Sequence, residues 1–125
     1  MSDETSGLRA YVDELIAATN AGKINWKTVN PSTFVWEPGA PKNARVSLQR
    51  VDRTTPTGNV TRREIFYLFQ AFDSMEPNTS PVVSVESRKD GELQLRFATL
   101  FELIKTGLSQ KNLDFLRSIL PSNQS

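Results

Sequence analysis

The 125-residue sequence contains no histidine and no cysteine. Histidine is the usual general base and metal ligand near neutral pH, and cysteine is the most reactive nucleophile and the main soft metal ligand. Their joint absence excludes thiol catalysis, zinc clusters, disulfide frameworks and Ser-His-Asp hydrolysis. We therefore expect no cofactor, no metal and no enzymatic activity, and a protein that works by binding.

Two further absences narrow the function. The six glycines are scattered, with no glycine-rich loop and no Gly-Lys-Ser/Thr sequence that could cradle phosphates, so nucleotide hydrolysis is not expected. No apolar run approaches the ~18 residues of a membrane span, and residues 1–5 are acidic and polar, unlike a signal peptide. We expect no membrane span and a cytoplasmic location.

Length and composition are those of an ordinary globular protein. A chain of 125 residues is the common size of a single domain, here 1–125, and 38% hydrophobic and 23% charged residues are close to the globular average. The net charge of +1 hides an uneven distribution, because residues 23–63 hold eight basic residues and only two acidic ones. This basic segment could form an anion-binding face.

The chain opens with a predicted helix over residues 7–21. Ser6 is a candidate N-cap and Gly22 a candidate C′ residue, since glycine readily takes the left-handed conformation that ends helices. The apolar residues that recur at helical spacing in this segment are Leu8, Tyr11, Val12, Leu15 and Ile16.

The middle of the chain is rich in β-forming residues. Alternating or aromatic segments predict strands over 33–37, 44–52, 64–72 and 82–87. A turn is predicted over 54–59 and a loop over 75–81. In 64–72 both the odd-numbered and the even-numbered positions carry apolar residues. This pattern favours a strand covered on both faces but leaves a buried helix as the competing prediction. Short connections favour an antiparallel meander.

The last third is predicted to be helical. One stripe comprises Leu93, Phe97, Leu100, Phe101 and Ile104, after which Gly107 is expected to end the helix and Ser109 to cap a second one. The predicted fold class is therefore α+β: an N-terminal helix, a four-stranded antiparallel β-meander and a C-terminal helical pair packed on one face of the sheet. Residues 1–5 and 121–125 are predicted to be flexible ends.

The run Leu15–Trp26 resembles the opening of small uncharacterised bacterial proteins, in which a helix ends in Gly-Lys or Gly-Arg and tryptophan follows closely. In those proteins an aromatic strand, a meander and an apolar helical tail come next, and the tail is similar to Leu100–Lys105. The order of elements matches over nearly the whole chain, although the linker 52–62 and the loop 75–81 are longer here. The resemblance implies an α-β4-α domain, and it implies no known activity, substrate or catalytic residue.

Paired carboxylates are the remaining candidates for catalysis or for binding a hard metal ion. The pairs are Asp13/Glu14, Asp73/Glu76 and Asp90/Glu92. Each pair has a structural explanation. The first lies on the solvent-exposed face of a predicted helix, the second at the end of a predicted strand, and the third at a predicted helix N-terminus, where negative charge is favourable. We therefore predict no catalytic residue among them.

The basic segment suggests binding of an anion or a nucleic acid. Its candidate residues are Arg45, Arg50, Arg53, Arg62 and Arg63. The nearby Trp26 and Trp36 could stack bases, but Trp36 in a strand is equally explained by core packing, and Trp26 by pinning the turn from helix to sheet.

The C-terminal region carries more apolar side chains than one sheet would cover. The candidate partner-binding residues are Phe97, Phe101, Leu103, Leu108 and Phe115. The alternative is that the two predicted helices pack on each other and on the first helix. We predict a non-catalytic interaction or regulatory module with a protein partner or a homodimer, and anion or nucleic-acid binding through residues 42–63 as the alternative function.

Overall fold

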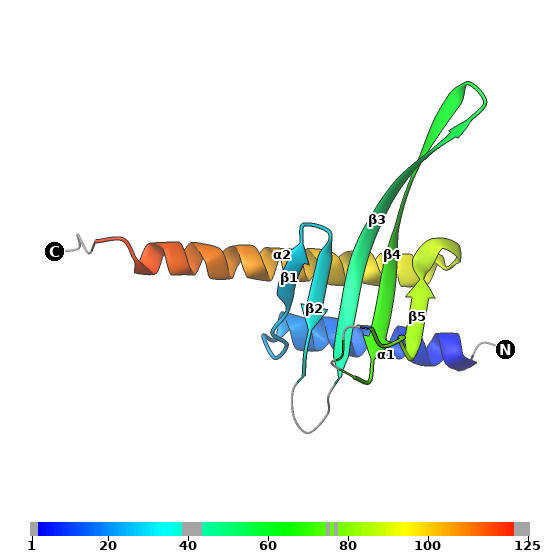
Figure 1. Ribbon diagram of the computed structural model, residues 1–125. Coiled ribbons are helices and arrows are strands. Elements are labelled where there is room, and N and C mark those ends of the chain that lie inside the picture. Colours follow the sequence, from blue (N-terminus) through cyan, green and yellow to red (C-terminus); the bar gives the residue numbers. More distant parts are fainter. Residues whose placement is uncertain (1–2, 39–43, 75, 77, 122–125) are drawn as a thin grey trace.

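A computed structural model describes residues 3–38, 44–74, 76 and 78–121 (Figure 1). The two helices lie side by side and run in the same direction across one face of the sheet (Figure 1). The predictions for residues 1–2 and 122–125 lie outside the described residues. The elements are α1 (Asp3–Asn20), β1 (Lys27–Asn30), β2 (Thr33–Trp36), β3 (Arg45–Thr57), β4 (Val60–Phe72), β5 (Val83–Glu86), the 3-10 turn η1 (Ser87–Lys89) and α2 (Gly91–Ser118).

The sheet is an antiparallel meander in the order β1-β2-β3-β4-β5, which confirms the α+β class and the meander. It has five strands rather than the predicted four. The strand that was missed is β1, and all four of its residues are exposed. An exposed edge strand shows no alternation between apolar and polar residues, so the sequence gives no signal for it.

The strands β3 and β4 form a long two-stranded ribbon. They pair continuously from Arg45 opposite Phe72 to Thr57 opposite Val60, and Gly58, with φ +64°, begins the two-residue turn. The turn predicted over 54–59 is present but shorter, at residues 58–59, because β3 continues through Thr57. Only the part of the ribbon near its open end has neighbours in β2 and β5, so the turn end projects beyond the sheet (Figure 1).

The segment 64–72 is a strand, which confirms that prediction and rules out the buried helix. Tyr67 and Phe69 point toward the helices: the ring of Phe69 stacks on Phe97 at 5.4 Å, and the ring of Tyr67 lies 5.7 Å from Phe101. The buried side chains between sheet and helices form one core, to which α1, the sheet and α2 all contribute.

The helix α1 begins at Asp3, four residues before the predicted start, so residues 3–5 are helical. Gly22 has φ +75°, which confirms it as the left-handed residue after the helix. Trp26 pins the following turn as expected: it is buried, and its Nε1 donates to Thr19 Oγ1 at 3.0 Å. Trp36 packs beside it, with the ring centroids 6.1 Å apart.

The predicted C-terminal helical pair is a single helix, α2, which runs through Gly107 and Ser109 without a break. A glycine inside a helix costs only about 1 kcal/mol relative to alanine, and no proline occurs before Pro121 to stop the helix. The side chain of Asp90 caps the start of α2 by accepting from the backbone N–H groups of Glu92 and Leu93, each at 3.1 Å.

Two side chains extend the hydrogen bonding of β4 beyond the end of β5. The backbone N–H of Tyr67 donates to Ser87 Oγ at 2.9 Å, and Gln94 Nε2 donates to the carbonyl oxygen of Ile65 at 3.2 Å. The Ser87 hydroxyl donates in turn to Gln94 Oε1. Ser87 is buried, so this link satisfies backbone groups that would otherwise be unpaired and ties the start of α2 to the sheet.

Candidate interaction surfaces

One apolar stripe runs along nearly the whole length of α2. Its members follow one another at steps of 4, 3, 4, 7 and 4 residues, which keeps them on one side of an uninterrupted helix. They are Phe97, Phe101, Ile104, Leu108, Phe115 and Ile119. Phe97 is fully buried, whereas Phe115 and Ile119 are 64% and 62% exposed.

The stripe changes from buried to exposed where the rest of the domain ends. The helix α1 stops at Asn20, and Lys111 of α2 donates to the side chain of Asn25 just beyond it, at 3.0 Å. From residue 109 to residue 121 every side chain is exposed. We call residues 109–120 the distal segment; it extends past both the sheet and α1 (Figure 1).

The predicted partner-binding residues fall into three groups. Phe97 and Phe101 are 0% and 3% exposed and lie in the core, so they are not part of any accessible surface, which corrects their assignment. Leu103 and Leu108 are half-buried. Phe115 is exposed, as the prediction requires. Two of the predicted residues are thus core because the sheet and α1 cover this stretch of α2.

Four exposed apolar side chains of the distal segment were missed as contact residues. They are Leu113, Leu116, Ile119 and Leu120. Of the four, only Ile119 continues the Phe97 stripe once Gly107 is taken as helical. Leu113, Leu116 and Leu120 lie on other sides of α2, where that stripe gives no signal for them.

A small apolar cavity lies next to the start of the distal segment. Its volume is about 120 Å³, and the indole of Trp26 forms one wall. The other lining residues are Thr19, Gly22, Ile24, Leu103, Ile104, Gly107, Leu108 and Lys111. Leu108 belongs both to this lining and to the α2 stripe, so the cavity adjoins the stripe where the distal segment begins.

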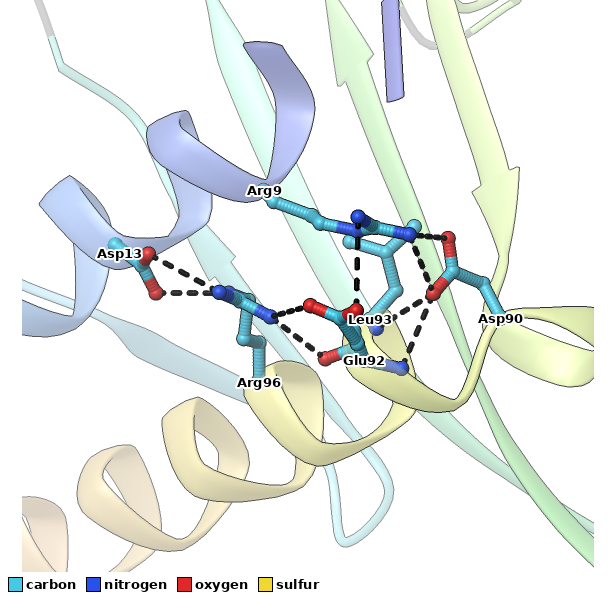
Figure 2. A network of polar contacts seen from close by, with 6 residues as sticks. All are labelled: Arg9, Asp13, Asp90, Glu92, Leu93 and Arg96. Carbon is cyan, nitrogen blue, oxygen red and sulfur yellow. Dashed lines mark hydrogen bonds and ion pairs between the residues drawn. The ribbon is translucent and has the colours of Figure 1, made fainter. Parts of the chain in front are cut away.

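Ion pairs join the middle of α1 to the start of α2 (Figure 2). Arg9 on α1 lies 3.2 Å from Asp90 and 3.7 Å from Glu92. Arg96 on α2 contacts Asp13 at 2.9 Å. These pairs hold the first turns of α2 against α1.

The carboxylates suggested by sequence as catalytic candidates have structural roles or lie exposed. The backbone N–H of Leu93 and the guanidinium of Arg9 hold the pKa of Asp90 below its usual value. Asp13 pairs with Arg96, and Asp73 and Glu76 are exposed. A general acid or base works best with a pKa near the operating pH, and the shift at Asp90 is in the opposite direction.

Three of the five predicted anion-binding arginines line one cleft, and the other two lie elsewhere on β3. Arg53, Arg62 and Arg63 line a cleft of about 430 Å³ near the tip of the β3–β4 ribbon. Arg45 stacks over the ring of Phe72 at 4.3 Å, far along β3 from this cleft, and Arg50 pairs in register with Tyr67 on the helix-facing side. Arg88 also lines the cleft and was missed, because nothing in the sequence relates η1 to the ribbon tip.

Two structural searches bear on metals and membranes. Across the described ranges, no three or more aspartate or glutamate side chains are grouped in a way that could hold a metal ion. None of the helices in the described part of the chain is both long enough and apolar enough to cross a membrane.

Comparison with protein-family models, with curated proteins and with solved structures finds no significant match for this chain. The resemblance to small bacterial proteins therefore stays a prediction.

Proposed function

We propose that this protein is a non-catalytic interaction module that associates with a second copy of itself through the distal segment of α2. The observation that carries the proposal is the continuity of the α2 stripe. The side chains that build the core at Phe97 and Phe101 are followed, on the same side of the helix, by Phe115 and Ile119 in solvent. Exposed contiguous apolar surface of this kind marks interaction sites.

Burying this surface is energetically favourable. A phenylalanine or isoleucine side chain gains about 1.5–3 kcal/mol when it moves from full exposure to full burial. In addition, a helix end without tertiary contacts has little stability of its own, because short helices are marginal in water. A partner that covers the distal segment therefore buries its apolar side chains and stabilises this end of the helix through tertiary contacts.

A second copy fits this surface for two reasons. A two-fold dimer needs only one self-complementary patch, and the distal segment together with the adjoining Trp26 cavity offers both a protruding and a hollow apolar feature. The segment also carries charges of both signs, Asp114 between Lys111 and Arg117. An antiparallel copy can set the carboxylate of Asp114 beside the partner's basic side chains.

The non-catalytic part of the proposal is supported by the state of the carboxyl groups. Hydrogen bonds from Arg63 and Arg53 hold the pKa values of Asp52 and Glu64 below their usual range, as Leu93 and Arg9 do for Asp90. These three groups are held as carboxylates, and a proton donor near neutral pH would need the opposite shift.

Sedimentation equilibrium over a wide concentration range tests the proposal. The wild-type protein is expected to approach the mass of a dimer as its concentration rises. The double variant Phe115→Glu/Ile119→Glu is expected to remain a monomer of 14.0 kDa with an unchanged circular dichroism spectrum in the folded range.

Leu95→Glu is the matched control, because Leu95 is also an exposed apolar residue of α2, 70% exposed, but lies before the distal segment and off its stripe. This variant is expected to dimerise like the wild type. A wild-type protein that stays monomeric at every concentration would overturn the proposal, and so would a dimer that Leu95→Glu disrupts as strongly as the double variant does.

A further inference from the structure

Four arginines from three segments of the chain meet at the tip of the β3–β4 ribbon. Arg53 comes from β3, Arg62 and Arg63 come from β4, and Arg88 comes from η1. Together with Thr55, Thr57 and Glu64 they line the cleft of about 430 Å³. This cleft is separate from the distal segment of α2 and takes no part in the proposed self-association.

Strand register places Arg53 and Arg62 on one side of the ribbon, whereas Arg63, the next residue in β4, has its side chain on the other side and pairs there with Asp52. Arg53 lies opposite Glu64, and Thr55 lies opposite Arg62, and directly opposed residues of antiparallel strands place their side chains on the same face. This face is the one turned away from the helices, since Phe66 on the same face alternates with Tyr67, whose ring faces Phe101 of α2, and arginines lie over the Phe66 ring. The hydroxyl groups of Thr55 and Thr57 are on the same face.

Two of the arginines are held in place before any ligand binds. The guanidinium groups of Arg53 and Arg88 lie 5.5 and 5.0 Å from the centre of the Phe66 ring, and Phe66 is only 4% exposed. Both also contact one carboxylate oxygen of Glu64, at 2.9 and 3.3 Å. Stacking and a shared carboxylate fix the guanidinium planes, which lowers the entropy lost when an anion binds.

The acidic groups near the cleft do not balance its positive charge. Arg53 and Arg88 share the single charge of Glu64, Arg88 also lies 3.9 Å from Glu86, and Asp52 pairs with Arg63 at 2.6 Å. Within the described part of the chain, Arg62 makes no ion pair. Four guanidinium groups therefore face three carboxylates, and the excess is about one positive charge, which favours the binding of an anion.

We propose that this cleft binds a phosphate group, with Arg62 and Arg88 as the main donors and the threonine hydroxyls as secondary ones. Guanidinium groups donate two parallel N–H bonds to phosphate oxygens, and the excess positive charge has the sign that attracts a phosphate. The phosphate can belong to a small molecule or to a nucleic-acid backbone, since both present the same tetrahedral oxygens to the arginines.

Isothermal titration calorimetry with inorganic phosphate and fluorescence anisotropy with a labelled single-stranded oligonucleotide test the two sources in separate arms. Arg62→Ala and Arg88→Ala are each expected to weaken binding about tenfold or more, the loss typical of one charge-assisted hydrogen bond. Binding is also expected to weaken as salt is raised.

Arg45→Ala is the matched control, because Arg45 lies on β3 but stacks on Phe72 outside the cleft. This variant is expected to bind like the wild type. Binding of inorganic phosphate that depends on Arg62 and Arg88 supports the site. Binding of the oligonucleotide alone with the same dependence supports it with a phosphodiester as the ligand. No binding in either arm, or binding that Arg45→Ala weakens as much as Arg62→Ala, overturns the proposal.

Discussion

The two halves of α2 carry the same apolar pattern and have opposite surroundings. In the first half, Phe97 and Phe101 contact aromatic side chains of the sheet, at 5.4 Å from Phe69 and 5.7 Å from Tyr67. The distal segment extends past the sheet (Figure 1), and there Phe115 and Ile119, on the same side of the helix, are exposed. An apolar stripe therefore shows which side of a helix favours burial, but it does not show what covers that side. The positions at which the sheet and α1 end decide which residues of the stripe are buried within the chain.

The largest effect expected from this comparison is the difference between Phe97→Ala and Phe115→Ala. Removing the buried ring of Phe97 should lower the free energy of unfolding by about 3–5 kcal/mol, because it leaves a cavity against Phe69. Removing the exposed ring of Phe115 should change it by less than about 0.5 kcal/mol in dilute protein. Urea denaturation at low protein concentration measures the free energy of unfolding of both variants. An equal loss in the two variants would contradict the contrast between the two halves of α2.

The next effect concerns what attaches the first half of α2 to the sheet. Ser87→Ala leaves the buried N–H of Tyr67 and one contact of Gln94 without a partner, so a loss of about 1–3 kcal/mol in unfolding free energy is expected. Ser118→Ala is the matched control, because Ser118 bonds only within its own exposed helix turn. Chemical denaturation should show almost no change for the control, and a similar loss in both variants would contradict this attachment.

A smaller effect, of opposite sign, is expected at the junction of the two halves. Gly107 is helical and has open space where a Cβ would be, so Gly107→Ala should stabilise the protein by about 0.5–1 kcal/mol. Gly22→Ala is the contrasting variant, because Gly22 has φ +75° and a side chain there is strained. Thermal unfolding should separate the two; a destabilising Gly107→Ala would mean that the helix does break between its halves.

The smallest effect concerns the ion pairs at the start of α2. The fold lowers the pKa of Asp90, so its carboxylate stabilises the folded state above the ordinary carboxyl range and this contribution is lost as pH falls through about 4 and below. Asp90→Asn keeps a capping oxygen but removes the charge. The thermal midpoint of this variant should therefore fall less steeply between pH 7 and pH 3 than that of the wild type. Identical acid profiles would contradict the role of Asp90.

Much of the fold could be predicted because its apolar patterns are long. The aromatic segment 64–72 and the alternation in 44–52 identify the central strands, and they are where burial is greatest. The edge strand β1 could not be found, since none of its side chains is buried. The break at Gly107 was predicted wrongly, because a glycine inside a helix costs only about 1 kcal/mol relative to alanine and does not by itself end the helix.

The candidate surfaces were predictable only in part. The basic segment gave three of the four cleft arginines, but Arg88 joins them through the chain reversal at η1, which no local pattern contains. The apolar surplus of α2 was visible in composition, yet which residues are exposed depends on where the sheet ends. Phe97 and Phe115 look alike in sequence, and tertiary structure alone separates them.

The most direct test of the central claim is amide hydrogen exchange measured segment by segment at a low and a high protein concentration. Amides of residues 93–104 should exchange slowly at both concentrations, because the sheet and α1 cover this half of α2 within one chain. Amides of residues 109–118 should exchange fast in dilute protein and become protected as the concentration rises. Fast exchange in the distal segment at both concentrations would contradict self-association through α2.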